Sequence, residues 1–244
     1  MNSLRRPANV LLATSLGLVL TGCASGGSPS SSNADGDAPP KPASRASSGE
    51  STSRATRGGG ARGAARRELE SRGKKFEVDD FIEAAEKNDV ELLQVFFDAG
   101  MDANAKDQYG RTAIMGAAER GRIGAIKLLL EKGADPNYYP PSFDSPLLIA
   151  AQHGESEAIR VLVAGGANVD QPAGATQGGT PLTRAADVDQ WDAVKALIDL
   201  GADPNLTYDS TTALFKAAEK GNEPIVRFLL EKGADPNKRA PGGA

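Results

Sequence analysis

Few side chains in this sequence have the types and spacing that catalysis or metal binding requires. His153 is the only histidine and Cys23 the only cysteine, so no Ser–His, Cys–His or multi-histidine metal arrangement is available. We interpret His153 as a surface contact residue, because a site of chemistry needs several convergent groups. The sequence therefore predicts no cofactor and no enzymatic activity.

Two local motifs suggest ligand binding but lack the context that it needs. Residues 58–63 place glycines as a dinucleotide-binding loop does, yet they follow no strand and open no apolar helix, so we interpret them as linker. Asp187, Asp189 and Asp192 form an acidic cluster. The residues around this cluster lack the glycine and the final glutamate of a calcium loop, so we interpret it as a solvated surface.

The N-terminus gives Cys23 a different chemistry. Arg5 and Arg6 precede an apolar run from Val10 to Leu20, which is shorter than the roughly 20 residues that cross a bilayer and is typical of a signal peptide over residues 1–22. The following sequence, Leu20-Thr21-Gly22-Cys23, resembles the lipobox of bacterial lipoproteins. This resemblance implies cleavage before Cys23, a diacylglyceryl group on its thiol and an acylated new amino terminus, which together anchor the chain in a membrane.

Two alternatives to a lipoprotein remain, namely an ordinary secretory signal with an incidental cysteine and a cytoplasmic protein with an apolar start. Both are weakened because Cys23 is the only cysteine, which leaves an exported domain with no thiol to oxidise and no disulfide. Ala24, rather than Asp, follows the cysteine. By resemblance to Gram-negative sorting patterns, this implies the outer membrane, with the protein facing the periplasm of the cell envelope.

Residues 23–75 are predicted to be a disordered tether, since they are mostly Ser, Gly, Ala, Pro and Arg and cannot bury enough apolar area to fold. Residues 41–75 contain ten Lys or Arg against three Glu, a net charge of +7, whereas residues 76–244 contain 16 basic and 27 acidic residues, a net charge of −11. The acidic domain argues against nucleic-acid binding. The basic tether is either drawn to anionic lipid or cell wall, or is a soluble linker.

Two motifs recur through the second half of the chain. The first begins with glycine and has Asn or Asp at its third and fifth positions, with steps of 33, 33, 35 and 32 residues between copies that start at Gly100, Gly133, Gly166, Gly201 and Gly233. The second joins Thr or Ser to an Ala-Ala pair and starts at Thr112, Ser145, Thr180 and Thr212. Repetition at such a period is typical of a solenoid.

The residue types of one period predict two short helices. Thr or Ser can cap a first helix, Pro at the next position suits its first turn, and the alanine pair lets a neighbouring helix approach. The first helix then ends at residues that tolerate a left-handed backbone: Asn88, Gly121, Gly154, Asp189 and Gly221. An amphipathic second run follows and ends at the glycine of the first motif.

This pattern resembles the ankyrin repeat, with its T-P-L-H-x-A-A and L-L-L-x-x-G-A-D-x-N signatures. The resemblance covers residues 76–240 and implies an all-α solenoid of five repeats, over about 76–108, 109–143, 144–178, 179–210 and 211–240. The histidine of the family is replaced by Met115, Leu148, Thr183 and Phe215, so we expect the hydrogen bonds that it usually gives between loops to be lost. The last repeat is predicted to be weakly capped, because it keeps apolar residues such as Leu230 with little chain after it.

The ankyrin resemblance also implies a protein partner, bound by a monomer through the finger loops and the exposed ends of the first helices. Carried over by position, the binding residues are Gln108, Tyr109, Arg111, Glu119, Arg120, Asp144, Gln152, His153, Gln177, Asp187, Val188, Tyr208, Asp209, Glu219 and Lys220. The aromatic residues Tyr138, Tyr139 and Phe143 either join this surface or pack on the adjacent finger. The hypotheses for function are a tethered binding module, its sharper form of an immunity-type protein that neutralises a periplasm-delivered toxin, and a structural spacer between membrane and cell wall.

Overall fold

The described part of the chain is built from α-helices. The computed structural model describes residues 52–172, 178–207 and 211–238, with side chains from residue 60 onward. Within these ranges it contains eleven α-helices and no strand beyond one isolated bridge, which confirms the all-α prediction. No described helix combines the length and the apolar character that a membrane span needs. The predictions for residues 1–51, including Cys23, and for Gln177, Tyr208 and Asp209 lie outside the described residues.

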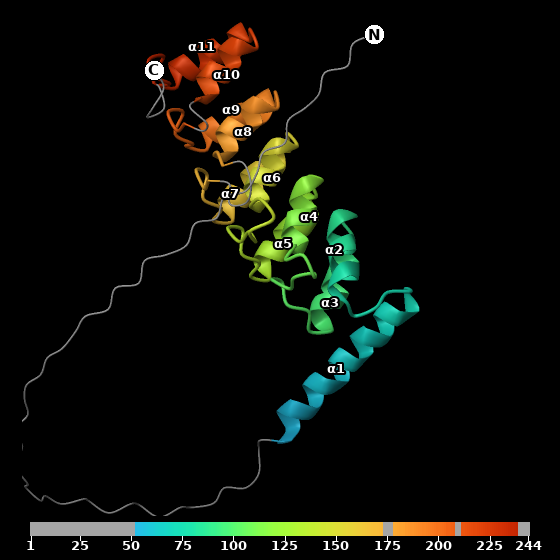
Figure 1. Cartoon of the computed structure of the whole chain (residues 1–244). Coiled ribbons are helices and arrows are strands. Elements are labelled where there is room, and N and C mark those ends of the chain that lie inside the picture. Colours follow the sequence, from blue (N-terminus) through green and yellow to red (C-terminus); the bar gives the residue numbers. More distant parts are fainter. Residues whose placement is uncertain (1–51, 173–177, 208–210, 239–244) are drawn as a thin grey trace, which may run out of the picture. The chain divides into compact units, whose positions relative to one another are not determined.

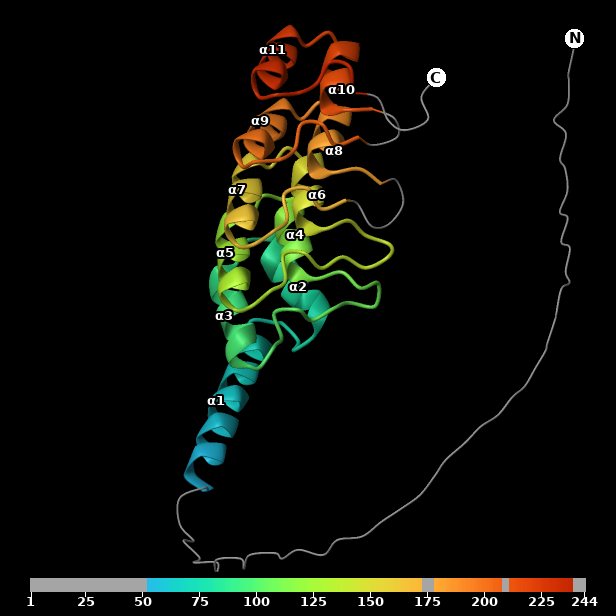
Figure 2. The same ribbon diagram turned by 90° about the vertical axis from the view of Figure 1, so that its left-hand side faces the viewer.

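After the N-terminal helix α1 (Thr52–Ser71), the helices form five pairs, as the repeat pattern predicts. The first helices of the pairs are α2 (Val78–Glu86), α4 (Ala113–Glu119), α6 (Pro146–Gln152), α8 (Pro181–Asp187) and α10 (Ala213–Glu219). The second helices are α3 (Val90–Asp98), α5 (Ile123–Glu131), α7 (Ser156–Ala164), α9 (Trp191–Asp199) and α11 (Glu223–Glu231). Consecutive first helices contact one another, and so do consecutive second helices from α3 to α9, which gives the two rows seen in Figure 2.

The turn inside each pair uses the left-handed backbone that its sequence predicts. The two non-glycine residues at this turn, Asn88 and Asp189, have φ angles of 58° and 62°, and both residue types tolerate this region. Asn88 also accepts a hydrogen bond at Oδ1 from the Ala125 N–H of the next pair, at 2.9 Å. At Gly154 the next pair approaches so closely that a Cβ would lie 2.2 Å from Gln190 Oε1. The turns therefore also form part of the contact between successive pairs.

The predicted N-terminal caps form on three of the first helices. The hydroxyls of Ser145, Thr180 and Thr212 accept backbone N–H groups three residues on, at 3.2–3.3 Å. Thr112 differs, because its buried Oγ1 has no hydrogen-bond partner among the described atoms. Its own N–H donates instead to Met115 Sδ at 3.4 Å. These caps satisfy N–H groups at the start of a helix that would otherwise lack a partner.

The core runs between the two rows of helices. The alanine pairs of α4, α6 and α8 are fully buried, and so is the apolar residue three positions before each pair: Ile114, Leu147 and Leu182. Alanine adds no bulk, so the first helices come close enough to contact along the whole row. Trp191 packs against this core from the start of α9.

Helix α1 shows that the predicted tether is wrong over its C-terminal part. Residues 52–71 are helical rather than disordered, and α1 contacts α3. Leu69 is completely buried and Ala65 nearly so, although the segment was expected to have no apolar reason to pack. The Arg66 guanidinium also lies over the Phe76 ring, 4.3 Å from its centroid. The folded region thus begins before residue 76, with a helix that covers the N-terminal end of the second row.

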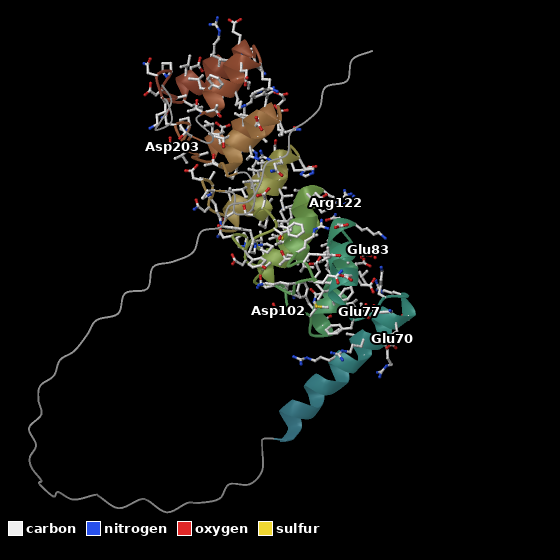
Figure 3. The ribbon with its side chains drawn as sticks, in the orientation of Figure 1. Glu70, Glu77, Glu83, Asp102, Arg122 and Asp203 are labelled. Carbon is white, nitrogen blue, oxygen red and sulfur yellow. The ribbon has the colours of Figure 1, made fainter. Side chains whose placement is uncertain are left out.

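The segment after α1 is held to α2 by charged groups. Lys74 Nζ donates to Asp80 Oδ1 at 3.0 Å and to Glu83, and the Lys75 N–H donates to Asp80 Oδ2 at 2.7 Å. Hydrogen bonds from Lys74 and Lys87 lower the pKa of Glu83, labelled in Figure 3, to about 2. The same contact with Glu83 raises the pKa of Lys74. These ion pairs fix the turn between α1 and the first repeat.

A ladder of asparagine side chains joins successive repeats at the end of the second helices. Asn104 donates from Nδ2 to the Gly133 carbonyl at 2.9 Å, and its Oδ1 accepts the Asp135 N–H at 2.8 Å. The same two hydrogen bonds recur at Asn137 and at Asn205, towards the repeat that follows each. This residue is the last one of the five-residue motif. The motif therefore makes hydrogen bonds between repeats as well as within one repeat.

The C-terminal end of the stack leaves apolar side chains open. Phe215 is 53% exposed and Leu230 is 43% exposed, and Ala218 is exposed as well. At the position of Phe215, the earlier repeats have Met115 and Leu148, which are both completely buried. The end repeat therefore lacks the cover that each inner repeat receives.

Candidate protein-binding surface

The described residues of the predicted binding surface fall into two groups by exposure. The exposed members are Gln108, Tyr109, Arg120, His153, Val188, Glu219 and Lys220. The half-buried members are Arg111, Glu119, Asp144, Gln152 and Asp187. They lie on the finger loops and at the C-terminal ends of the first helices, and we call this set the binding strip.

The first finger of the binding strip presents Tyr109. Asp107 Oδ1 accepts the backbone N–H groups of Tyr109 and Arg111, each at 2.8 Å, and the Asp107 N–H donates to the Arg111 carbonyl at 3.0 Å. This local turn leaves Tyr109 67% exposed. Tyr109 is therefore a largely exposed aromatic side chain on a finger whose backbone is held by hydrogen bonds.

Ion pairs tie this finger to the first two repeats. Arg111 lies between two carboxylates, with Nη1 3.0 Å from Glu86 Oε1 and Nη2 against Glu119. Arg120 Nε lies 3.6 Å from the other oxygen of Glu86. Arg122, which is labelled in Figure 3, donates from Nε to the Glu86 carbonyl at 2.8 Å. Arg111 and Glu119, predicted as binding residues, thus position the strip, while Arg120 keeps half of its side chain exposed.

A second group of ion pairs ties the fourth repeat to the fifth. Lys216 Nζ lies 3.0 Å from Asp187 Oδ1 and 3.5 Å from Glu219 Oε2, and the hydrogen bond with Asp187 raises the pKa of Lys216. Lys220 Nζ lies 3.0 Å from Asp189 Oδ2. Lys216 was not among the predicted binding residues. It precedes an alanine pair on a first helix, and that position alone could have indicated it.

The middle of the binding strip has fewer formal charges than its ends. Gln152 donates from Nε2 to Asp144 Oδ2 at 3.2 Å, and His153 Nδ1 lies 3.0 Å from the Ile149 carbonyl of its own helix. Val188 is 40% exposed at the position that Arg120 and Lys220 occupy in their repeats. The strip therefore has ion-paired ends and a centre formed by an imidazole, an amide and an aliphatic side chain.

The aromatic loop after the second repeat packs on the neighbouring finger. Tyr138 Oη donates to the Gly110 carbonyl at 3.4 Å, and Lys106 Nζ lies 3.9 Å from the centroid of the Tyr138 ring. Pro140 is buried, and a Cβ on Gly110 would lie 2.9 Å from it. Of the two alternatives for this loop, the structure favours packing over an open binding patch. Phe215 is the exposed aromatic residue that the sequence interpretation did not assign to a surface.

The described residues show no arrangement for covalent or metal chemistry. No group of three or more His, Cys, Asp or Glu among them could hold a metal ion. A cavity of about 310 Å³ beside the first repeat is lined by Lys74, Glu83 and Lys87, but these groups form ion pairs with each other. The binding strip offers side chains for contact and no reactive constellation.

Comparison with known families decides what this stack is. The family model for ankyrin repeats matches residues 81–173 and 147–240, which together exceed half of the chain. The chain is an ankyrin-repeat protein. No curated protein gave a significant match to it. The ankyrin match begins after α1, so this helix is an addition to the repeats.

Membership of the ankyrin family confirms the predicted fold and its general role. Ankyrin repeats generally mediate protein–protein interaction and are typically not enzymes. The binding strip consists of the finger and first-helix positions through which that resemblance predicts contact with a partner. The individual strip residues and the lipid anchor stay predictions.

Proposed function

We propose that this ankyrin-repeat protein is a membrane-tethered interaction module of the bacterial envelope, which binds a protein partner through the binding strip. The observation that carries the proposal is the exposure of Tyr109, Arg120 and Val188 on a strip whose two ends are fixed by ion pairs between repeats. The lipobox Leu20–Cys23 supports the tether. With Ala24 after the cysteine, we propose the periplasmic face of the outer membrane.

A strip held in this way suits binding because little order has to be gained when a partner docks. Ion pairs of Arg111 and Lys216 span neighbouring repeats, and the asparagine ladder restrains the same repeats on another side. A surface that is already rigid loses less conformational entropy on association. Tyr and Arg side chains also dominate the energetics of protein interfaces. Tyr109 and Arg120 are therefore the proposed anchors, with Val188 in the neutral centre.

The test compares two triple variants of the full-length protein in cells. Tyr109→Ala, Arg120→Ala and Val188→Ala remove the proposed contacts, while the control Lys127→Ala, Glu157→Ala and Arg160→Ala removes three exposed side chains of second helices. Cross-linking followed by quantitative mass spectrometry should show a protein that is lost by at least about tenfold from the first variant only, as expected when hot-spot side chains are removed. Thermal unfolding of both variants should match the parent protein. Equal recovery of every cross-linked protein from both variants would favour a spacer role.

The tether is tested separately from the strip. The mature protein should begin at Cys23 with a mass that includes acyl chains, and Cys23→Ser should move the protein from the membrane fraction to the soluble fraction. A mature protein that starts at another residue would refute lipid anchoring and leave the binding strip unaffected.

A further inference from the structure

The arginines of α1 whose side chains are described have no carboxylate partner, unlike most cations near the binding strip. Residues 60–75 contain six Lys or Arg and two Glu, a net charge of +4. Carboxylates lie within ion-pair distance of the last three cations: Arg72, Lys74 and Lys75. Arg62, Arg66 and Arg67 are exposed, and no described carboxylate pairs with them. On the binding strip, by contrast, Arg111 and Lys220 both have carboxylate partners.

This basic helix belongs to the same folded body as the acidic repeats. Residues 49–244 form one compact unit, and the buried side chains of Ala65 and Leu69 join α1 to α3. In both views the N-terminal half of α1 extends beyond the paired helices (Figures 1 and 2). Residues 60–75, with a net charge of +4, thus lie at one end of the repeats, whereas residues 76–244 have a net charge of −11. A negatively charged surface will therefore attract the α1 end of this body and repel the repeats.

We propose that α1 binds the anionic surface of a phospholipid bilayer, with its arginines towards the lipid headgroups and the repeats held away. The inference rests on the proposed function in one respect, because the lipid anchor is what brings the protein to a membrane. Each Lys or Arg close to an anionic lipid surface strengthens partitioning by about fivefold. The acidic repeats are repelled by the same surface, so both effects favour one orientation.

The consequence of this orientation concerns the binding strip. Because α1 is packed on α3 rather than hinged to it, the direction of α1 at the lipid also sets the direction of the row of repeats. The strip is then held in one direction relative to the bilayer. A tether alone would leave every orientation equally populated.

The binding assay uses protein without lipid, so that only charge can hold it to a bilayer. Residues 24–244 contain the whole compact unit and are mixed with vesicles of phosphatidylglycerol and phosphatidylcholine or of phosphatidylcholine alone. The protein should sediment with the first kind of vesicle and not with the second. Raising the salt should release it, because the Debye length falls from about 10 Å at 0.1 M to about 3 Å at 1 M.

Two variants with the same net charge then locate the contact. Arg62→Gln, Arg66→Gln and Arg67→Gln should weaken partitioning by at least about tenfold, given about fivefold for each charge. The control Lys127→Gln, Arg160→Gln and Lys238→Gln removes three exposed cations of the repeats and should change partitioning by less than about twofold if only cations near the lipid contribute. A third variant, Arg62→Lys, Arg66→Lys and Arg67→Lys, keeps the charge and should bind as the parent does, which separates loss of charge from loss of packing.

Each other outcome overturns the proposal. Equal weakening by the Gln variant and its control would mean that net charge, and not α1, controls association. Binding to isolated peptidoglycan but not to the anionic vesicles would assign α1 to the cell wall instead. Failure here leaves the lipid anchor intact, because the acylation of Cys23 is measured on the cellular protein by its mass.

Discussion

Asp170 and Asp203 meet across the boundary between the third and fourth repeats. The Asp203 N–H donates to Asp170 Oδ1 at 3.1 Å and to its Oδ2 at 3.4 Å, and Asp203 is labelled in Figure 3. Asn137 and Asn205, which hold this position in other repeats, also donate to a glycine carbonyl of the next repeat. An ionised carboxylate has no proton to donate. One rung of the asparagine ladder is therefore incomplete at this boundary.

Completing that rung should stabilise the protein. Asp170→Asn supplies a donor for the carbonyl of Gly201, which corresponds to Gly166 and Gly233, and a hydrogen bond of this kind contributes about 0.5–1.5 kcal/mol. Urea titration at neutral pH should show a higher unfolding free energy by about that amount. The reciprocal change Asn137→Asp should lower it. A less stable Asp170→Asn protein would contradict the proposed role of this position.

The effect of Asp170 should also depend on pH. Burial raises the pKa of its carboxyl above the ordinary 3.8, so the folded state holds the proton more tightly than the unfolded state does. The resulting stabilisation is fully present below pH 3.8 and is lost as the pH rises through the folded pKa. The advantage of Asp170→Asn over the parent protein should thus be largest at neutral pH and shrink on acidification. A difference that stays constant from neutral to acidic pH would speak against this linkage.

Glu83 should show the opposite dependence. Its pKa is lowered from 4.5 to about 2 by hydrogen bonds from Lys74 and Lys87, so its contribution is present above pH 4.5 and lost as the pH falls towards about 2. Glu83→Gln should be less stable than the parent protein at neutral pH, and the difference should diminish below pH 4.5. The exposed Glu91, which has no described ion pair, gives the control Glu91→Gln. Identical pH profiles for the two variants would count against the assigned ion pairs.

Docking of α1 should depend on one leucine. Leu69 is fully buried between α1 and the repeats, and truncation of a buried leucine to alanine costs about 2–5 kcal/mol when the helix must stay docked. Leu69→Ala should therefore increase hydrogen exchange in α1 and α3 and lower the unfolding free energy. Arg67→Ala, on the exposed side of the same helix, should change stability by less than about 0.5 kcal/mol. Unaltered exchange in α3 after Leu69→Ala would show that α1 does not cover it.

Hydrogen exchange should also be fastest at the C-terminal end of the repeats. Phe215 and Leu230 are exposed there, and among the described residues only one repeat contacts α10 and α11, so these helices can open without disrupting a second described interface. The amides of α6 to α9 should exchange most slowly. Exchange that is slowest over residues 212–240 would refute the weak capping of this end.

The regular part of the fold could be predicted from the sequence because each position of a repeat has a local physical cause. Asn88 and Asp189 indicate left-handed turns by residue type alone, and their φ angles confirm it. Ser145, Thr180 and Thr212 likewise indicate helix starts through their hydroxyls. Such signals repeat in register, so an error in one copy is corrected by the others.

Features that occur once were not predictable in this way. Helix α1 has two described buried side chains, Ala65 and Leu69, in a segment otherwise rich in Gly and Arg, and their burial depends on α3 being nearby. The role of Arg111 depends on Glu86, which lies in the previous repeat. Pairings across repeats need the stack itself before they can be recognised.

The two ends of the stack differ in a way that bears on how such an array can change in length. Helix α1 closes one end by covering α3, whereas the other end leaves Phe215 and Leu230 uncovered and places Asn237 where Asn205 binds the repeat that follows. A duplicated unit inserted after Asn237 could pack on Phe215 and Leu230. Asn237 could then bind that unit as Asn205 binds the repeat after it. Among the described residues, only the C-terminal end of the repeats is therefore sterically open to a further unit.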